Sequence, residues 1–306
     1  MRQTALDMVH ELARQDARVL FIGSDLGPTT LAGMREEFPD RFFMEGVSEQ
    51  AIIGMAAGLA MEGFIPYVNT IATFLTRRCF EQVALDLCLH NLPVRLIANG
   101  GGLVYAPLGP THLAIEDFAL LRPLPNMTIV APADADEMRR FMAATIEWPG
   151  PIYVRLGKGG DPVISTSEHG FAIGRAILHR QPGRVLICST GIMTKYALDA
   201  ADLLSARGIK AGVLHLHTIK PLDTAAIREL AGSVEVLATL EEHVAVGGLG
   251  SAIVDSLVQD GRTRLPRLLR YALPDKFPDD YGSQASLLKR FELTPEAVAA
   301  NIAACF

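Results

Sequence analysis

The stretch FMEGVSEQAIIGMAAGLAMEGFIPYV, residues 43–68, carries the pattern on which the predicted fold depends. Its middle, Ala51 to Met61, consists of Ile, Gly, Met, Ala and Leu and predicts a buried helix, and the apolar run Phe64 to Val68 predicts a strand. Glu49 lies at the mouth of this helix. An ionised carboxylate in dry surroundings is costly without a partner, and proteins tolerate that cost mainly where a proton must be controlled. The alternative is a solvated first-turn glutamate that the helix dipole favours.

The same alternation of helix and strand extends outward from this stretch. Apolar runs at 18–23, 94–98, 127–130 and 152–155 predict strands, and segments at 4–14, 74–89 and 134–146 predict helices. Buried strands that alternate with helices indicate a parallel sheet covered on both faces. In such sheets ligands bind beyond the carboxyl ends of the strands.

A second series of the same kind follows a break in the pattern. Leu156 to Gly170 holds four glycines and one proline without periodicity, which is typical of a linker. Strands are then predicted at 184–189, 211–216 and 234–240, with helices between them. We therefore expect an α/β protein of two doubly wound domains, with boundaries at 1–160, a linker at 161–170 and a second domain at 171–306.

Composition excludes several classes of protein. The 306 residues are 49% apolar and 20% charged, as in a soluble globular protein, and a formal net charge of −6 argues against a nucleic-acid or anionic-membrane surface. The four cysteines are far apart, which favours reduced thiols and a cytoplasmic location. The start, Met1 to Thr4, lacks the pattern of a signal peptide, and no apolar run is long enough to span a membrane.

Two segments that follow predicted strands contain candidate site residues. In NTIATFLTRR, residues 69–78, the ring of Phe74 could stack on a flat heterocycle, although core packing is the plainer alternative. In GGGLVYAPLGPTH, residues 100–112, three glycines permit unusual backbone angles or close approach of a ligand. His112, placed before an expected helix at 113–121, could act as a general acid or base, or merely satisfy its loop.

A basic set, Arg2, Arg77, Arg155 and Lys158, is spread over three segments. Arginine forks match the oxygens of phosphate, so these residues could hold an anionic group. The alternative is four independent surface cations.

These motifs together resemble the C-terminal half of transketolases. The resemblance also extends to 1-deoxyxylulose-5-phosphate synthase and, more loosely, to the β subunits of 2-oxo acid dehydrogenase E1 components. It covers nearly the whole chain and rests on Gly-Val-Ser-Glu-Gln, Thr-Phe-Leu-Thr-Arg, Gly-Pro-Thr-His and Ala-Pro-Ala-Asp-Ala-Asp-Glu in the first half, and on Thr218–Asp223, Glu241–His243 and Gly247–Gly250 in the second.

The resemblance implies a pyrimidine-binding domain of a thiamine diphosphate enzyme, followed by a transketolase C-terminal domain. Glu49 matches the glutamate that contacts N1′ of the aminopyrimidine ring, and Phe74 matches the aromatic residue that stacks on it. His112 matches a substrate-facing histidine. The remaining matches are Ile71 and Asp25 beside the coenzyme, and Arg2, Thr29, Arg77, Arg155 and Lys158 near sugar hydroxyls or a terminal phosphate.

One expected motif is absent from the sequence. Thiamine diphosphate enzymes hold the diphosphate through Mg²⁺ with a Gly-Asp-Gly sequence and a later Asn, and this chain contains no Gly-Asp-Gly. We therefore expect a separate N-terminal transketolase subunit that carries this motif and binds Mg²⁺. Thiamine diphosphate would be shared between the two subunits, in a heterotetramer with two copies of each.

Two positions depart from the family pattern and leave the sugar substrates open. Leu108 stands where an aspartate is usual, and Gly100 where transketolases usually have a histidine. Loss of hydroxyl-reading groups suggests an unusual sugar, a smaller aldehyde, or a deoxy or sulfo analogue as acceptor. The leading hypothesis is transfer of a two-carbon ketol unit, and the second is acyl transfer by a 2-oxo acid enzyme. A nucleotide-binding module at Gly248-x-Gly250 is a remote third, because the third glycine of that fingerprint is missing.

Overall fold

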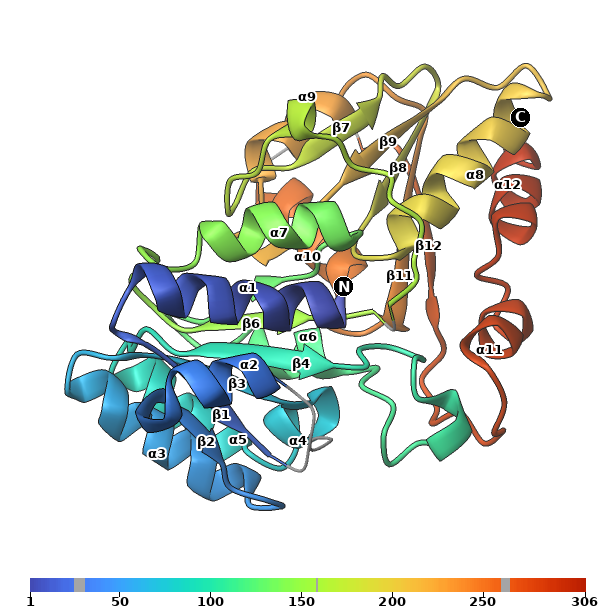
Figure 1. The fold of residues 1–306 in the computed structure, drawn as a ribbon. Coiled ribbons are helices and arrows are strands. Elements are labelled where there is room, and N and C mark those ends of the chain that lie inside the picture. Colours follow the sequence, from blue (N-terminus) through green and yellow to red (C-terminus); the bar gives the residue numbers. More distant parts are fainter. Residues whose placement is uncertain (25–30, 158, 260–264) are drawn as a thin grey trace.

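Two open sheets organise the chain in the computed structural model, which describes residues 1–24, 31–157, 159–259 and 265–306 (Figure 1). The first sheet has seven strands in the order β10-β5-β6-β4-β3-β1-β2, all parallel except β10. Its strands are β1 (Val19–Gly23), β2 (Phe42–Met44), β3 (Ile65–Ile71), β4 (Arg95–Asn99), β5 (Thr128–Val130), β6 (Ile152–Arg155) and β10 (Thr218–Lys220). The predicted parallel sheet is confirmed.

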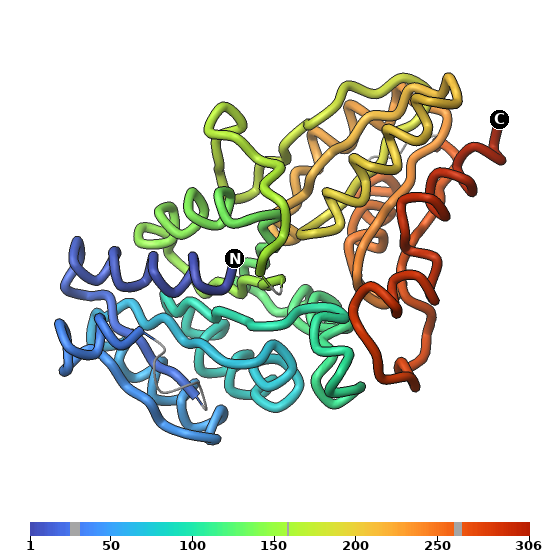
Figure 2. The backbone as a smooth tube through the Cα atoms, turned by 45° about the vertical axis from the view of Figure 1, so that its right-hand side comes forward, coloured from blue at the N-terminus to red at the C-terminus, as the bar shows by residue number. Residues whose placement is uncertain are grey.

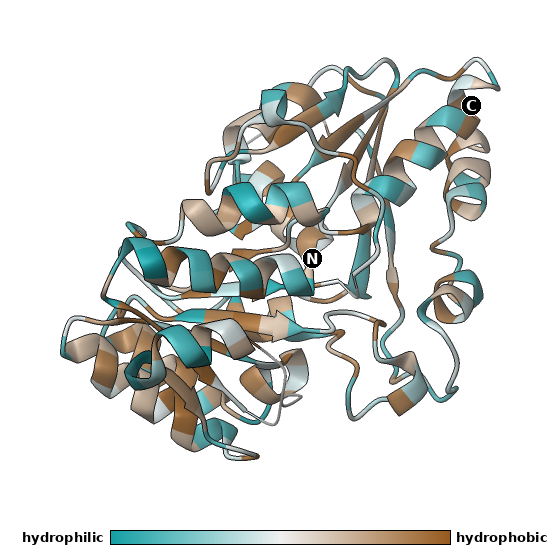
Figure 3. Cartoon of the chain, viewed as in Figure 1, coloured by the Kyte–Doolittle hydropathy of each residue, from teal (hydrophilic) through white to brown (hydrophobic). Residues whose placement is uncertain are grey.

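Both faces of the first sheet are covered by helices, which explains why its central strands are apolar at every position. Along β1, Leu20 and Ile22 pack in the core under α3 (Glu49–Met61), whereas Val19 and Phe21 pack under α1 (Arg2–Gln15) and α7 (Ala135–Ala143). Figure 1 shows α1 and α7 side by side on one face and α3 on the other. In Figure 3 brown dominates along several strands of this sheet, whereas α1 and α7 alternate between teal and brown, as helices with one buried and one exposed face do.

The second sheet has five strands in the order β12-β11-β8-β9-β7, of which only β7 is antiparallel to its neighbour. Its strands are β7 (Ile177–Arg180), β8 (Val185–Ser189), β9 (Ala211–His215), β11 (Val236–Val244) and β12 (Arg267–Leu273). The helices of this half are α8 (Met193–Ser205), α9 (Thr224–Ala231), α10 (Leu249–Gln259), α11 (Gln284–Arg290) and α12 (Pro295–Ala303). The second α/β unit is thus also confirmed.

The halves are joined more closely than two separate domains would be. Strand β10 comes from the second half of the sequence, but it pairs antiparallel with β5 at the edge of the first sheet, with Thr218 opposite Val130. The segment before α11 also reaches back, because a Cβ on Gly109 would lie 2.6 Å from the ring of Tyr281. Figure 2 shows this segment beside the loop that follows β4.

Two expected helices differ from the structure. The predicted helix 74–89 is three pieces, α4 (Ala72–Thr76), α5 (Phe80–Gln82) and the π-helical turn η2 (Val83–Leu89). The predicted helix 113–121 is wrong in its first half, because α6 (Asp117–Leu121) begins only at residue 117. The other described helices of the first half are α2 (Ala32–Glu37) and the short turns η1 (Pro39–Arg41) and η3 (Ala106–Leu108); η4 (Ser167–His169) lies in the linker.

No helix in the described part of the chain combines the length and the apolar character needed to cross a bilayer.

Candidate active site

Three of the predicted site residues, Glu49, Phe74 and His112, lie at the carboxyl ends of neighbouring parallel strands. Glu49 is the first residue of α3, which follows β2. Phe74 lies in α4, directly after β3, and the glycine loop with His112 follows β4. Ser24 follows β1, which lies between β2 and β3 in the sheet. Because these strands are parallel, their connections meet at one edge of the sheet, which is where such folds bind ligands.

The carboxylate of Glu49 is buried, with only 3% of its surface exposed, and both of its oxygens have side-chain partners. Ser24 Oγ lies 3.0 Å from Oε1, and Arg78 Nη1 lies 2.6 Å from Oε2. Burial alone would raise the pKa of Glu49. Hydrogen bonds from Arg78, from its own backbone amide and from Ser24 outweigh burial and hold that pKa below its ordinary value. The carboxylate is therefore charged in this structure.

Phe74 is half-buried and contacts two other members of the site. The guanidinium carbon of Arg78 lies 4.0 Å from the centre of the Phe74 ring, and the ring of His112 meets it edge-on with centres 5.4 Å apart. One guanidinium thus touches both the aromatic face and the carboxylate of Glu49. The four side chains of Glu49, Arg78, Phe74 and His112 form one continuous cluster.

His112 is held in place by the segment around it and by Arg77. Its Nδ1 lies 2.9 Å from Thr111 Oγ1, and its backbone amide donates to Gly109 O at 3.0 Å. Arg77 Nη2 donates to Thr111 O at 3.0 Å, and Arg77 Nε lies 3.1 Å from Glu116 Oε1. Arg77, expected at the substrate, therefore contacts the backbone that carries His112.

The three consecutive glycines are required by contacts within the chain. Gly100 and Gly102 have φ of +74° and +63°, a region that side chains rarely adopt. A Cβ on Gly100 would lie 2.1 Å from the ring of Tyr105, and a Cβ on Gly101 would lie 2.1 Å from Arg155. Tyr105 thus fills the space that a side chain at position 100 would need.

Arg155 is buried and paired inside the protein. Its guanidinium donates to both carboxylate oxygens of Asp117 at 2.9 Å and to Ala114 O at 2.6 Å, and only 8% of its side chain is exposed. The ion pair offsets burial and raises the pKa of Arg155. All three of these acceptor atoms, two on Asp117 and one on Ala114, belong to this chain.

The other predicted residues lie as follows. Arg2 is in the first turn of α1, whose start lies beside Gly157 and Gly159 at the end of β6. Ile71, half-buried, ends β3, and Leu108 is 49% exposed. Asp25, Thr29 and Lys158 lie outside the described residues.

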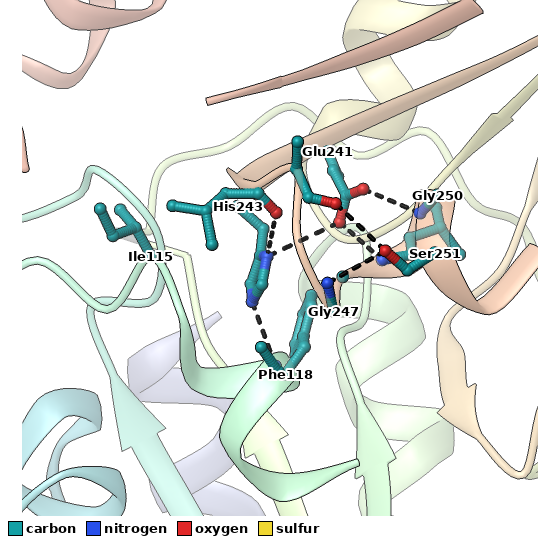
Figure 4. A network of polar contacts seen from close by, with 12 residues as sticks. Ile115, Phe118, Glu241, His243, Gly247, Gly250 and Ser251 are labelled. Atoms are coloured by element: carbon teal, nitrogen blue, oxygen red, sulfur yellow. Dashed lines mark hydrogen bonds and ion pairs between the residues drawn. The ribbon is translucent and has the colours of Figure 1, made fainter. Parts of the chain in front are cut away.

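A buried polar network fastens the second half of the chain to α6 next to the site (Figure 4). The ring of His243 stacks on Phe118 with centres 5.3 Å apart and accepts from the amide of Ala119 at 3.2 Å. Burial lowers the pKa of His243 to about 4, so the ring is neutral, as an acceptor nitrogen requires. Glu241 accepts from the amides of Leu249 and Gly250 at 2.6 and 2.8 Å, while burial raises its pKa to about 7.

Two residues that contact Glu49, Arg78 and Ser24, are not among the predicted site residues. Arg78 stands four residues after Phe74, a spacing that brings side chains together on a helix and could have indicated the contact. Ser24 directly follows an apolar strand that ends at Gly23, and polar residues at that place face the ligand edge of a parallel sheet.

Comparison with known proteins gives the same family for both halves. Residues 1–160 match the family model of the transketolase pyrimidine binding domain, and residues 174–298 match that of the transketolase C-terminal domain. An uncharacterized transketolase family protein of Sinorhizobium fredii is 38% identical over 95% of this chain and 84% of its own length. A 6-deoxy-6-sulfo-D-fructose transketolase subunit of a Clostridium species is 33% identical over 97% of this chain and 92% of its own.

A solved structure described as a split gene transketolase in an inactive β4 tetramer is also similar. It superimposes with a TM-score of 0.90 at 35% identity, and the match covers 98% of this chain and 95% of that one. The chain spans about half the length of other relatives, the 1-deoxy-D-xylulose-5-phosphate synthases, for example 45% of the enzyme of Desulforudis audaxviator at 38% identity.

Proposed function

This chain belongs to the transketolase family, and on that premise we propose that it is the ring-binding subunit of a thiamine diphosphate enzyme that transfers a two-carbon ketol unit from a ketose to an aldehyde. The observation that carries the proposal is the buried carboxylate of Glu49, linked through Arg78 to the half-buried ring of Phe74 at the carboxyl edge of the sheet. When bound, the coenzyme supplies a stabilised carbanion for the carbon–carbon bond chemistry.

The described residues fit an aminopyrimidine ring. Such a ring is flat, so it can stack on Phe74, and its nitrogens can hydrogen-bond to a carboxyl group. The guanidinium of Arg78, also flat and rich in N–H groups, already touches both side chains, which supports the fit. In this proposal Phe74 binds the ring, Glu49 holds a proton at N1′, and Ser24 orients the carboxylate.

His112 is proposed to bind or protonate a substrate oxygen. Its ring meets the Phe74 ring edge-on, so it lies beside the surface on which the coenzyme ring is proposed to stack. Arg77 positions the segment that carries His112 through its bond to Thr111 O.

The diphosphate and Mg²⁺ are assigned to a separate subunit with the Gly-Asp-Gly…Asn motif. The names of two relatives, a transketolase subunit and a split gene transketolase, support this division of the site between two chains. We propose a heterotetramer with two copies of each subunit, in which this chain alone does not turn over substrate.

The substrate is proposed to be a sugar with an anionic end that differs from the common pentose and hexose phosphates. Gly100 and Leu108 lack the usual hydroxyl-reading groups, and the space beside Gly100 is filled by Tyr105. One relative is named for a sulfo sugar, and another, 35% identical, for apulose-4-phosphate. Profiling the two-subunit enzyme would contradict this if ordinary pentose and hexose phosphates were clearly the best substrates.

The central test is Glu49→Ala in the reconstituted two-subunit enzyme. We expect turnover to be abolished while the circular dichroism spectrum and melting temperature are retained, because Arg78 is 42% exposed and water can solvate it once its partner is removed. Glu296→Ala is a matched control, since Glu296 is also a first-turn glutamate, in the distant helix α12. Near-normal turnover of Glu49→Ala would refute the role of Glu49.

The similarity to 1-deoxy-D-xylulose-5-phosphate synthases supports a second candidate, acyl transfer from a 2-oxo acid. The same reconstituted enzyme distinguishes the two. Release of carbon dioxide from pyruvate would favour the second candidate, and transfer from a ketose phosphate or its sulfo analogue without carbon dioxide would favour the first.

A further inference from the structure

Arg78 makes the two contacts that the proposed function assigns to the coenzyme ring. Its guanidinium lies over the Phe74 ring at 4.0 Å and donates to Glu49 Oε2 at 2.6 Å. Ser24 Oγ donates a hydrogen bond to the other oxygen of Glu49, Oε1, at 3.0 Å. A ring that stacked on the same face and bonded to the same oxygen would overlap with the guanidinium.

We propose that Arg78 is a built-in placeholder for the coenzyme ring, which occupies the Glu49–Phe74 pocket when the coenzyme is absent and must swing out before the ring can enter. The inference rests on the proposed function, because it takes Glu49 and Phe74 as the ring's contacts.

Electrostatics gives a reason for such a placeholder. Glu49 is 3% exposed, and a carboxylate so buried is strongly unfavourable without a partner. Arg78 supplies the missing partner and lowers the pKa of Glu49, so the pocket without coenzyme is stable with Glu49 charged.

The placement of Arg78 lets it leave. It follows the short helix α4, and its side chain is 42% exposed, whereas its partner Glu49 is buried. When the pair breaks, water solvates the half-exposed guanidinium, so the remaining cost is the unpartnered, buried carboxylate of Glu49. An incoming ring that also bonds to Glu49 can therefore displace it.

The consequence is a lowered apparent affinity for the coenzyme. Binding to a site that is open in only a fraction of molecules is weakened by that fraction. If Arg78 closes the pocket in about nine molecules of ten, its removal strengthens ring binding about tenfold.

The test is the affinity of the full chain for 4-aminopyrimidine, which presents a neutral ring without thiazolium or diphosphate. Wild type, Arg78→Ala and Arg78→Gln are compared by NMR titration. Arg184→Ala is a matched control. Arg184 also lies 4.0 Å over a phenylalanine ring, that of Phe306, and 2.6 Å from a glutamate, Glu235. It directly precedes β8 of the second sheet, whereas the candidate site lies on the first sheet. Glu49→Ala in each background reports whether binding uses the proposed pocket, because alanine can neither donate to nor accept from the ring.

We expect Arg78→Ala and Arg78→Gln to bind the ring about tenfold more tightly than wild type, with Arg184→Ala unchanged. Equal affinity in all four proteins, or weaker binding in the Arg78 variants, overturns the placeholder. If Glu49→Ala abolishes binding in the same experiment, the proposed function stays intact. Absence of binding in every protein, or binding that Glu49→Ala does not weaken, overturns both.

Discussion

At the scale of the residue, Glu49 is charged in a nearly water-free position because each of its oxygens has its own donor. Ser24 is buried and fixed, whereas Arg78 is half-exposed. The two donors therefore differ in how readily they can be replaced. A carboxylate with one permanent and one exchangeable partner is suited to passing a proton to a ligand and taking it back.

Phe74→Ala tests the proposed stacking surface. We expect it to weaken coenzyme binding to the two-subunit enzyme by about 1–2 kcal/mol, because the aromatic contact is lost. The change also removes the face on which Arg78 rests. In wild type, the lost stacking is therefore partly offset, because Arg78 also competes less well for the pocket. In the Arg78→Ala background only the stacking is lost, so the decrease in coenzyme affinity measured by calorimetry should be larger there.

An unchanged dissociation constant for Phe74→Ala in both backgrounds would exclude Phe74 from the coenzyme site. An equal loss in both would show that Arg78 and the ring do not compete for its face.

At the scale of the element, the glycine loop after β4 is shaped by the side chains packed against it. Gly100→Ala places a Cβ 2.1 Å from Tyr105 and also puts alanine at φ +74°. Gly208 has φ +75° with nothing within 4 Å of its Cβ position, so Gly208→Ala isolates the cost of the backbone angle. We expect about 1 kcal/mol for Gly208→Ala, and at least about 1 kcal/mol more for Gly100→Ala because Tyr105 must move.

Urea unfolding of the two variants measures these costs. The pair Gly100→Ala and Tyr105→Ala should couple, so that the double variant loses less than the sum of the single losses. Equal destabilisation by Gly100→Ala and Gly208→Ala would mean that Tyr105 yields without cost.

The sequence predicted the long, periodic elements well and the broken ones poorly. Buried strands such as β1 and β4 are apolar throughout, so their positions were evident. The segment 74–89 has helical periodicity without Gly or Pro, but it is broken at residues 77–79, where Arg77 donates to Thr111 O and Arg78 to Glu49. Pairing over such distances leaves no local signal.

The wrong first half of the predicted helix 113–121 has a similar cause. Ala114 is apolar and helix-favouring, but its carbonyl accepts from the amide of Gly102 and from Arg155. These bonds hold the residue in an extended bridge to the glycine loop. The structure brings Glu49, Phe74 and His112 into one cluster, and their assignment as site residues stays a prediction.

At the scale of the whole molecule, Glu242 connects three distant parts of the chain. Its Oε1 accepts from the amide of Leu103 at 2.9 Å and from Gln284 Nε2 at 2.8 Å. Burial raises the pKa of this carboxyl from 4.5 to about 7, against the opposing effect of Arg155. The folded protein therefore binds a proton here more tightly than the unfolded chain.

A raised pKa fixes the sign of the pH dependence. The stability that this proton contributes is complete below the unfolded pKa of 4.5 and is lost as pH rises through about 7. Glu242→Gln keeps an oxygen acceptor and has no proton to lose. The free energy of unfolding of wild type relative to Glu242→Gln should therefore fall between these pH values, by up to about 3 kcal/mol.

Denaturant titrations at several pH values give this difference directly. A difference that rises with pH, or does not change, would show that Glu242 is ionised in the folded protein throughout this range.

Because β10 pairs with β5, the protein cannot be divided into two independent fragments at the boundary between the two family domains. A fragment that stops at the linker would leave β5 with an open row of backbone N–H and C=O groups, a template for pairing with another molecule. Protease cleavage at the linker should instead give two pieces that stay associated, because β10 of one piece still pairs with β5 of the other.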